Sequence, residues 1–209
     1  MSIFDIFKSK ANAKTISLEK QLDTLSKLGI KPVHGDFLDW LCTEWSKDAI
    51  ESDPYNLMLF SLGGERERGN SWEYLSDDIF YFDTECVEEE DIYETVIKRL
   101  EVLAKGAFQT VGLHSAADIE RQTAFVSFSF NSVQYRWNLE FDDDWFDVRV
   151  ISYINYLLHT SGSQSYFYTS IPDQGITVVF TNKETIAELN LLVETQFILE
   201  KAEPPASIP

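Results

Sequence analysis

Residues 124–141 have the sequence AFVSFSFNSVQYRWNLEF, and they carry the clearest β-strand signal in the chain. Phenylalanine alternates with smaller residues over positions 124–130, and a short Asn131-Ser132 turn leads into a second alternating run with Tyr135, Trp137, Leu139 and Phe141. Alternation with a period of two is typical of half-buried strands, and a compact polar turn between two such runs predicts an antiparallel hairpin. We expect this hairpin to have one aromatic face.

An acidic cluster follows the hairpin directly and leads into an apolar helix. Residues 140–159 have the sequence EFDDDWFDVRVISYINYLLH, with apolar side chains recurring at helical spacing. This pattern predicts a helix over residues 145–159 that is buried on most of its sides. Carboxylates before a helix accept hydrogen bonds from its free amides and suit its dipole, so we expect Asp142, Asp143 and Asp144 to cap this helix.

A second acidic junction occurs earlier in the chain, with the same order of elements. A strand over residues 79–82 precedes seven carboxylates within residues 83–94, and a helix over residues 92–104 follows, ending at Gly106. Both halves therefore show a strand, an acidic loop, an amphipathic helix and a glycine. If the two strands share one sheet, both acidic loops lie at its end.

The remaining elements complete an α+β pattern. We expect helices over residues 17–28 and from Asp36, a buried strand over 56–62, a polar loop or hairpin tip over 65–70, a strand over 108–113, a hairpin of 165–169 with 176–181, and a last helix carrying Ile186, Leu189, Val193 and Phe197. The predicted fold is a single α+β domain, mainly an antiparallel sheet of hairpins with amphipathic helices packed on it. A Lys-rich helical segment (residues 1–31) precedes this acidic domain (32–201), and we expect residues 202–209 to be disordered.

The net charge of −18 is unevenly distributed along the 209 residues. Residues 1–31 contain six lysines and three acidic residues, a balance of +3, which leaves −21 for the rest of the chain. A body this acidic repels nucleic acid and anionic membranes, and it attracts basic partners. We therefore expect a basic protein as partner, with no nucleic acid and no membrane; the oligomeric state stays open.

The N-terminal stretch MSIFDIFKSKANAK resembles neither a signal peptide nor a membrane span, so we expect a cytoplasmic protein. Ile3, Phe4, Ile6 and Phe7 followed by lysines predict a short amphipathic helix. Such a helix is too short to be stable alone, and we expect it to pack on its own domain rather than on a membrane surface.

The sequence contains no motif for a cofactor. Cys42 and Cys86 lack C-x-x-C spacing and are expected to be free thiols, with the pKa of Cys86 raised by nearby carboxylates. The three histidines lack metal-binding spacing, and the glycines match neither a Walker loop nor a dinucleotide fingerprint. We therefore expect no cofactor and no metal.

These observations favour a non-catalytic protein that binds a basic partner through its two acidic loops. Tyr93 and Trp145 are included as aromatic anchors. The candidate partner-binding residues are Glu85, Glu88, Glu89, Glu90, Asp91, Tyr93, Asp142, Asp143, Asp144 and Trp145. The alternative is a metal-dependent hydrolase that uses the carboxylates of residues 142–147, although their spacing does not match an EF-hand loop.

The segment WEYLSDDIFYFDTEC, residues 72–86, together with the later DDDWFD, resembles small cytosolic bacterial immunity proteins that act against polymorphic or contact-dependent toxins. The resemblance extends loosely over residues 72–192 and lies in size, acidity, α+β order and the lack of a catalytic motif. It implies binding to a cognate toxin, often a basic nuclease, and blocking of its active site. It assigns no individual residues.

Overall fold

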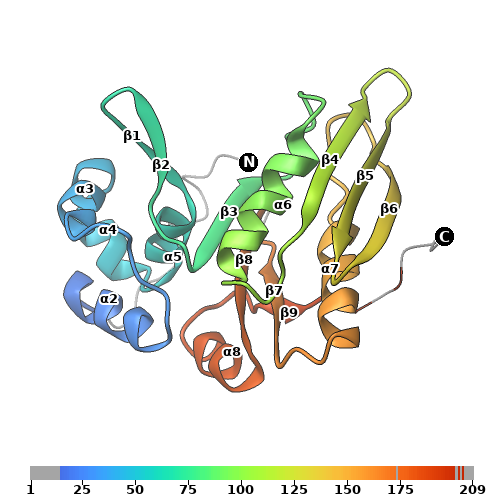
Figure 1. The fold of residues 1–209 in the computed structure, drawn as a ribbon. Helices are drawn as coiled ribbons and strands as arrows, with labels where there is room; N and C mark the ends of the chain where they lie inside the picture. The colour runs from blue at the N-terminus through green and yellow to red at the C-terminus, as the bar shows by residue number, and fades with distance from the viewer. Residues whose placement is uncertain (1–14, 173, 201, 203, 205–209) are drawn as a thin grey trace.

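Strands β3 (Ile79–Asp83), β8 (Gly175–Asn182), β7 (Ser165–Ser170) and β9 (Ile198–Leu199) form a four-stranded antiparallel sheet at the centre of the molecule, in the order β3-β8-β7-β9 (Figure 1). The computed structural model describes residues 15–172, 174–200, 202 and 204. Seven helices and nine strands lie in these described residues. All strand pairs are antiparallel, which confirms the predicted α+β domain built from hairpins and amphipathic helices.

The central sheet separates two hydrophobic cores. Consecutive residues of β3, Ile79 and Phe80, belong to different cores, and so do Val178 and Val179 of β8. Successive side chains of a strand point to opposite faces, so a strand covered on both faces is apolar at every position. The central strands are therefore buried on both sides.

The first core lies between the central sheet and a three-stranded sheet of order β4-β5-β6. This second sheet consists of β4 (Val111–Asp118), β5 (Thr123–Phe130) and β6 (Val133–Glu140). Helices α6 (Ile92–Leu103) and α7 (Arg149–Thr160) contribute their apolar sides to the same core. Asn131 and Ser132 form the tight turn between β5 and β6 with φ angles of 50° and 66°, which confirms the predicted hairpin.

The second core is covered by helices on the opposite face of the central sheet. They are α2 (Leu18–Lys27), α3 (Phe37–Glu44), α4 (Lys47–Ser52), α5 (Asn56–Gly63) and α8 (Lys183–Asn190). The predicted helices at 17–28 and from Asp36 are confirmed as α2 and α3. Side chains of both helices share this core, on either side of the expected boundary at residue 31.

A small hairpin of β1 (Glu65–Arg68) and β2 (Ser71–Tyr74) extends beside these helices. Arg66 binds Asp36 at 2.8 Å, and Arg68 lies 3.7 Å from Glu73. The two arginines therefore neutralise nearby acids.

The predicted strand over residues 56–62 is wrong, because this segment forms α5. Its run of apolar residues is buried on nearly every side, and a helix buried all round shows no periodicity that separates it from a buried strand. Gly63 ends α5 against β3, where a side chain would collide with the Tyr81 backbone nitrogen. The neighbouring short helix α4 has no counterpart in the sequence prediction.

Three further boundaries differ from the prediction. Strand β4 begins at Val111 instead of 108 and continues to Asp118, while Phe108 packs in the core against Phe128 and Phe130. Helix α8 ends at Asn190, so Val193 and Phe197 follow it in an irregular segment. The two strands that precede the acidic loops do not share a sheet, because β3 belongs to the central sheet and β6 to the three-stranded one.

Two expectations concern residues that lie wholly or mostly outside the described part of the chain. The amphipathic helix expected near the N-terminus lies outside the described residues, as does most of the tail from residue 202. Among the helices of the described residues, none combines the length and apolar character needed to cross a membrane.

Candidate functional site

The two acidic loops meet although their strands belong to different sheets. The backbone amides of Cys86 and Val87 both donate to the Asp144 carbonyl, at 3.0 and 2.9 Å. Glu85 and Trp145 pair next to them in an isolated antiparallel bridge. Backbone pairing therefore fixes one loop against the other.

The turn between β7 and β8 adds a third segment to this junction. The Thr84 amide donates to the Gln174 carbonyl at 3.1 Å, and the Phe146 amide donates to the Thr84 carbonyl at 2.7 Å. The Gln174 side-chain amide donates to Glu85 Oε2 at 3.0 Å and to Asp83 Oδ2 at 3.3 Å. Gln174 thus holds two carboxylates of the first loop close together.

Aromatic side chains pack in the first core next to this junction. Phe146 stacks on Tyr93 with ring centroids 4.4 Å apart and meets Phe82 edge-on at 5.4 Å. Tyr93 is fully buried, and its hydroxyl oxygen accepts a hydrogen bond from the Asp147 amide at 3.0 Å. Burial raises the pKa of this hydroxyl. Tyr93, which we expected among the partner-binding residues, lies on the apolar side of α6 and is buried in the core.

Asp147 is the carboxylate that serves the start of α7. It accepts from the Arg149 backbone amide at 3.1 Å, and its two oxygens bind the Arg149 guanidinium at 2.8 and 2.7 Å. This hydrogen bonding raises the pKa of Arg149, as does the negative charge of Asp147. The side chain of Asp147 is 4% exposed, so the ion pair joins a buried carboxylate to an arginine at the protein surface.

The predicted capping by Asp142, Asp143 and Asp144 is wrong. These residues form a separate turn, in which the Trp145 amide donates to the Asp142 carbonyl at 3.0 Å and Asp143 has a φ of 57°. Helix α7 begins only at Arg149, whose backbone amide donates to Asp147. The bridge at Trp145 requires an extended backbone, so α7 starts several residues later than predicted.

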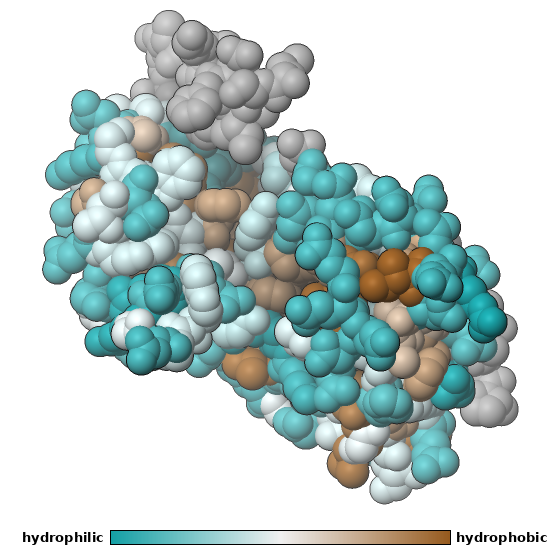
Figure 2. Space-filling model, turned by 90° about the horizontal axis from the view of Figure 1, so that it is seen from above, coloured by the Kyte–Doolittle hydropathy of each residue, from teal (hydrophilic) through white to brown (hydrophobic). Residues whose placement is uncertain are grey.

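The carboxylates gathered at this junction form a surface that we call the acidic end. Figure 2 views the molecule from this side, where hydrophilic side chains predominate. Its exposed carboxylates are Asp83, Glu85, Glu88, Glu89, Glu90, Asp91, Asp118, Glu120, Glu140, Asp142 and Asp143, with Asp144 half-buried among them. The positive charges on these loops are Arg121 and Arg149, which pair with Asp118 and Asp147. The surface is therefore strongly negative.

Trp145 is the large aromatic side chain exposed within the acidic end. It is 42% exposed, although the bridge to Glu85 fixes its backbone. The sequence prediction missed Asp118 and Glu120, which join this surface from the β4–β5 turn. Because that prediction ended β4 at residue 113, it gave no reason to place the turn beside the other two loops.

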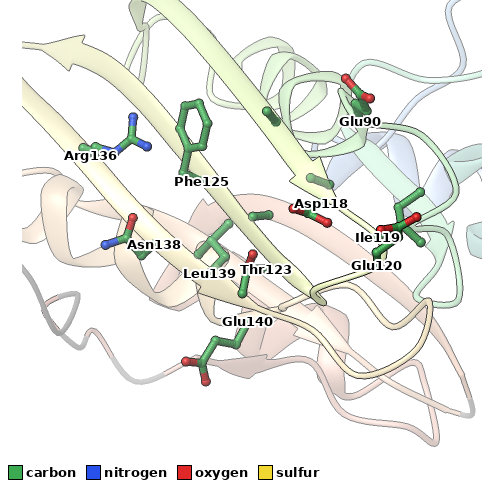
Figure 3. A pocket seen from close by; sticks show the side chains of 13 residues that line it. Glu90, Asp118, Ile119, Glu120, Thr123, Phe125, Arg136, Asn138, Leu139 and Glu140 are labelled. Carbon is green, nitrogen blue, oxygen red and sulfur yellow. The ribbon is translucent and has the colours of Figure 1, made fainter.

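A pocket of about 700 Å³ adjoins the acidic end on the outer face of the three-stranded sheet (Figure 3). Phe125 lies in its middle, paired across the sheet with Ala116 and Asn138. The Arg136 guanidinium stacks on the Phe125 ring at 3.7 Å from the centroid. Glu90, a residue of the acidic end, also lines the pocket. The pocket therefore connects the acidic end with the outer face of the sheet.

Both cysteines are free thiols, as predicted. Burial raises the pKa of Cys86 to about 12, with smaller contributions from the negative charges of Asp83, Asp144 and Glu88. In the described part of the chain, no group of three or more His, Cys, Asp or Glu side chains is arranged to hold a metal ion. The acids of residues 142–147 are divided between a surface turn and the Arg149 ion pair.

In comparisons with known proteins, no family model, no curated protein and no solved structure matches this chain.

Proposed function

We propose that this chain is a non-catalytic protein whose acidic end binds a basic partner protein. The observation that supports this most is the position of Trp145, which is 42% exposed and fixed by a backbone bridge among exposed carboxylates. Tryptophan is enriched among the residues that carry most of the binding energy at protein interfaces. Carboxylates around such an anchor attract a cationic surface and speed its association.

The rigidity of the junction favours binding as well. Three loops from different parts of the chain are joined by backbone hydrogen bonds at Thr84, Asp144 and Gln174. A surface that is ordered before binding loses less conformational entropy when the partner arrives. The neighbouring pocket has Glu90, Asp118, Glu120 and Glu140 among its lining residues and offers room for a long basic side chain of the partner.

We further propose that the partner is a basic toxin domain, which the chain neutralises by covering its active site. This narrower proposal rests on the resemblance to immunity proteins and on the negative charge of the body after residue 31. A toxin that acts on nucleic acid carries a positive surface, to which the acidic end is complementary.

The test is calorimetric titration with the product of the neighbouring gene, at low and high salt. We expect Asp142→Asn/Asp143→Asn to weaken binding about tenfold and to reduce its salt dependence, since both side chains are exposed. The matched control is Glu184→Gln/Glu188→Gln, which removes two exposed charges from α8, away from the acidic end, and should leave affinity nearly unchanged. If neither the salt concentration nor the aspartate substitutions change the affinity, the proposal is contradicted.

A further inference from the structure

A second recess lies on the other side of the central sheet, away from the three-stranded sheet. We call it the Tyr81 groove; it has a volume of about 580 Å³ and lies between α5, the central sheet and the segment that follows α8. Helices cover this face of the sheet at the level of Ile79 and Val179. Tyr81 and Thr177 form a pair two residues further along the same two strands, and both line the groove.

The groove has an aromatic wall. Phe60 of α5 is 40% exposed and meets the Tyr81 ring edge-on at 4.5 Å, while Trp45 approaches Phe60 at 6.4 Å. Gly175 of β8 leaves room for the Tyr81 ring, because a Cβ atom there would collide with it. Phe60 is exposed and Tyr81 half-buried, and apolar surface of this kind in a recess indicates a site that another apolar segment covers.

The described chain begins at the edge of this groove. The Ile16 amide donates to the Glu51 carbonyl of α4 at 3.3 Å. Ser52 and Asp53, the next two residues of that helix end, line the groove. Any segment that precedes Thr15 therefore starts beside it.

The preceding residues have the chemistry that the groove requires. Residues 1–14 lie outside the described residues, and their sequence is MSIFDIFKSKANAK. Ile3, Phe4, Ile6 and Phe7 supply apolar side chains, and three lysines follow them. The groove carries carboxylates at Asp53 and Glu194, which suit those lysines.

We propose that residues 3–7 of the chain's own N-terminal segment occupy the Tyr81 groove, with the lysines directed to its acidic rim. Seven residues lie between Phe7 and Thr15, and the eight peptide units that join them can span about 26 Å when extended, so the segment is long enough to enter the groove. A short tether gives an effective concentration in the millimolar range, which lets a weak apolar contact form within one molecule. This proposal does not depend on the acidic end or on its partner.

Disulfide trapping tests the proposal in the full chain with Cys42→Ser. We expect Phe7→Cys/Thr195→Cys to form an intramolecular disulfide at least about tenfold faster than Phe7→Cys/Val133→Cys, because Thr195 lines the groove and Val133 lies in the three-stranded sheet. Equal rates for the two pairs would overturn the proposal. A disulfide that forms only between two molecules, with a rate that rises with protein concentration, would assign the groove to a second copy instead.

Limited trypsin digestion provides a second measurement. Phe4→Asp/Phe7→Asp should speed cleavage after Lys8 and Lys10 several-fold by releasing the segment. Ser2→Asp/Ser9→Asp adds the same charge without removing apolar side chains and should have a much smaller effect. If the two double variants are cleaved at the same rate as the natural chain, the groove does not hold this segment. Tight binding of the natural chain to anionic vesicles, lost in Phe4→Asp/Phe7→Asp, would likewise overturn the proposal in favour of a membrane anchor.

Discussion

Glu85 and Trp145 pair across an antiparallel bridge although their loops follow strands of different sheets. The bridge places a partly exposed indole beside a carboxylate, in a backbone that is hydrogen bonded on both sides. The acidic end is therefore an ordered surface with an aromatic anchor, and the substitutions below distinguish its binding role from its structural role.

Trp145→Ala should reduce affinity for the basic partner about thirtyfold, corresponding to about 2 kcal/mol, because it removes the aromatic anchor. The free energy of unfolding should fall as well, because more than half of the surface of this residue is buried, so it is measured separately. Trp72→Ala is the control, because Trp72 is 69% exposed on the β1–β2 hairpin. Titration calorimetry and urea unfolding measure the two effects, and equal losses of affinity in both variants would contradict a specific role for Trp145.

Asp147→Asn should lower the free energy of unfolding by about 1–2 kcal/mol, because it breaks a bidentate ion pair with Arg149 at the start of α7. Asp118→Asn is the matched control. Asp118 also pairs with an arginine close in sequence, but at 3.7 Å and with a side chain that is 45% exposed, so we expect a change below about 0.5 kcal/mol. Urea unfolding of the two variants at neutral pH makes the comparison.

Arg99→Met should destabilise the protein by about 3 kcal/mol. The Arg99 side chain is 3% exposed, donates to the Ser76 carbonyl and to Asp77 at 3.1 Å, and stacks on Tyr74 at 3.9 Å. Methionine fills similar space but leaves the buried carbonyl without its donor. Lys98→Met, on the exposed side of the same helix, should have little effect in the same denaturant titration; similar losses in both would contradict this account.

The free energy of unfolding should fall at alkaline pH in a way that depends on Cys86. Burial raises the pKa of its thiol from 9.0 to about 12, so the folded chain holds the proton more tightly than the unfolded chain. The stabilisation is complete below pH 9 and decreases as the pH rises towards 12. Urea unfolding between pH 8 and pH 11 should therefore show a smaller loss of stability in Cys86→Ala than in the natural chain. Parallel pH profiles for the two proteins would rule out this linkage.

Ser132→Gly should stabilise the β5–β6 hairpin by about 0.5–1 kcal/mol. Ser132 has a φ of 66° in a two-residue turn, a conformation that glycine adopts without strain. Ser132→Val should have the opposite effect, because a β-branched residue is strained at positive φ. Thermal unfolding of both variants tests the sign, and a stabilising valine would show that the turn has another conformation in solution.

The elements with strong local patterns were predictable from the sequence. The β5–β6 hairpin follows from alternation over residues 124–141, and α2 follows from the spacing of its leucines with Ser17 as N-cap. Helix α5 could not be predicted, because a short apolar run has the same appearance in a buried helix and in a buried strand. Local patterns thus decide elements with one buried face and fail for elements buried on all sides.

The candidate site was predictable in composition but not in arrangement. The sequence identifies both acidic loops, yet only long-range pairing brings Glu85 to Trp145 and adds Gln174 and the β4–β5 turn. Tyr93 illustrates the limit, because a tyrosine in an acidic segment can point outward or into the core. Its direction depends on the rotation of α6, which here places the Tyr93 ring in the core against Phe146.

The central sheet also constrains when the protein can fold during its synthesis. Strand β3 pairs with β8, whose residues are translated long after those of β3. Both cores use side chains from β8, so neither is complete until that strand has left the ribosome. Pairing between distant segments slows folding and leaves apolar surface exposed in the meantime. The nascent chain is therefore expected to expose apolar side chains of both cores until β8 has emerged.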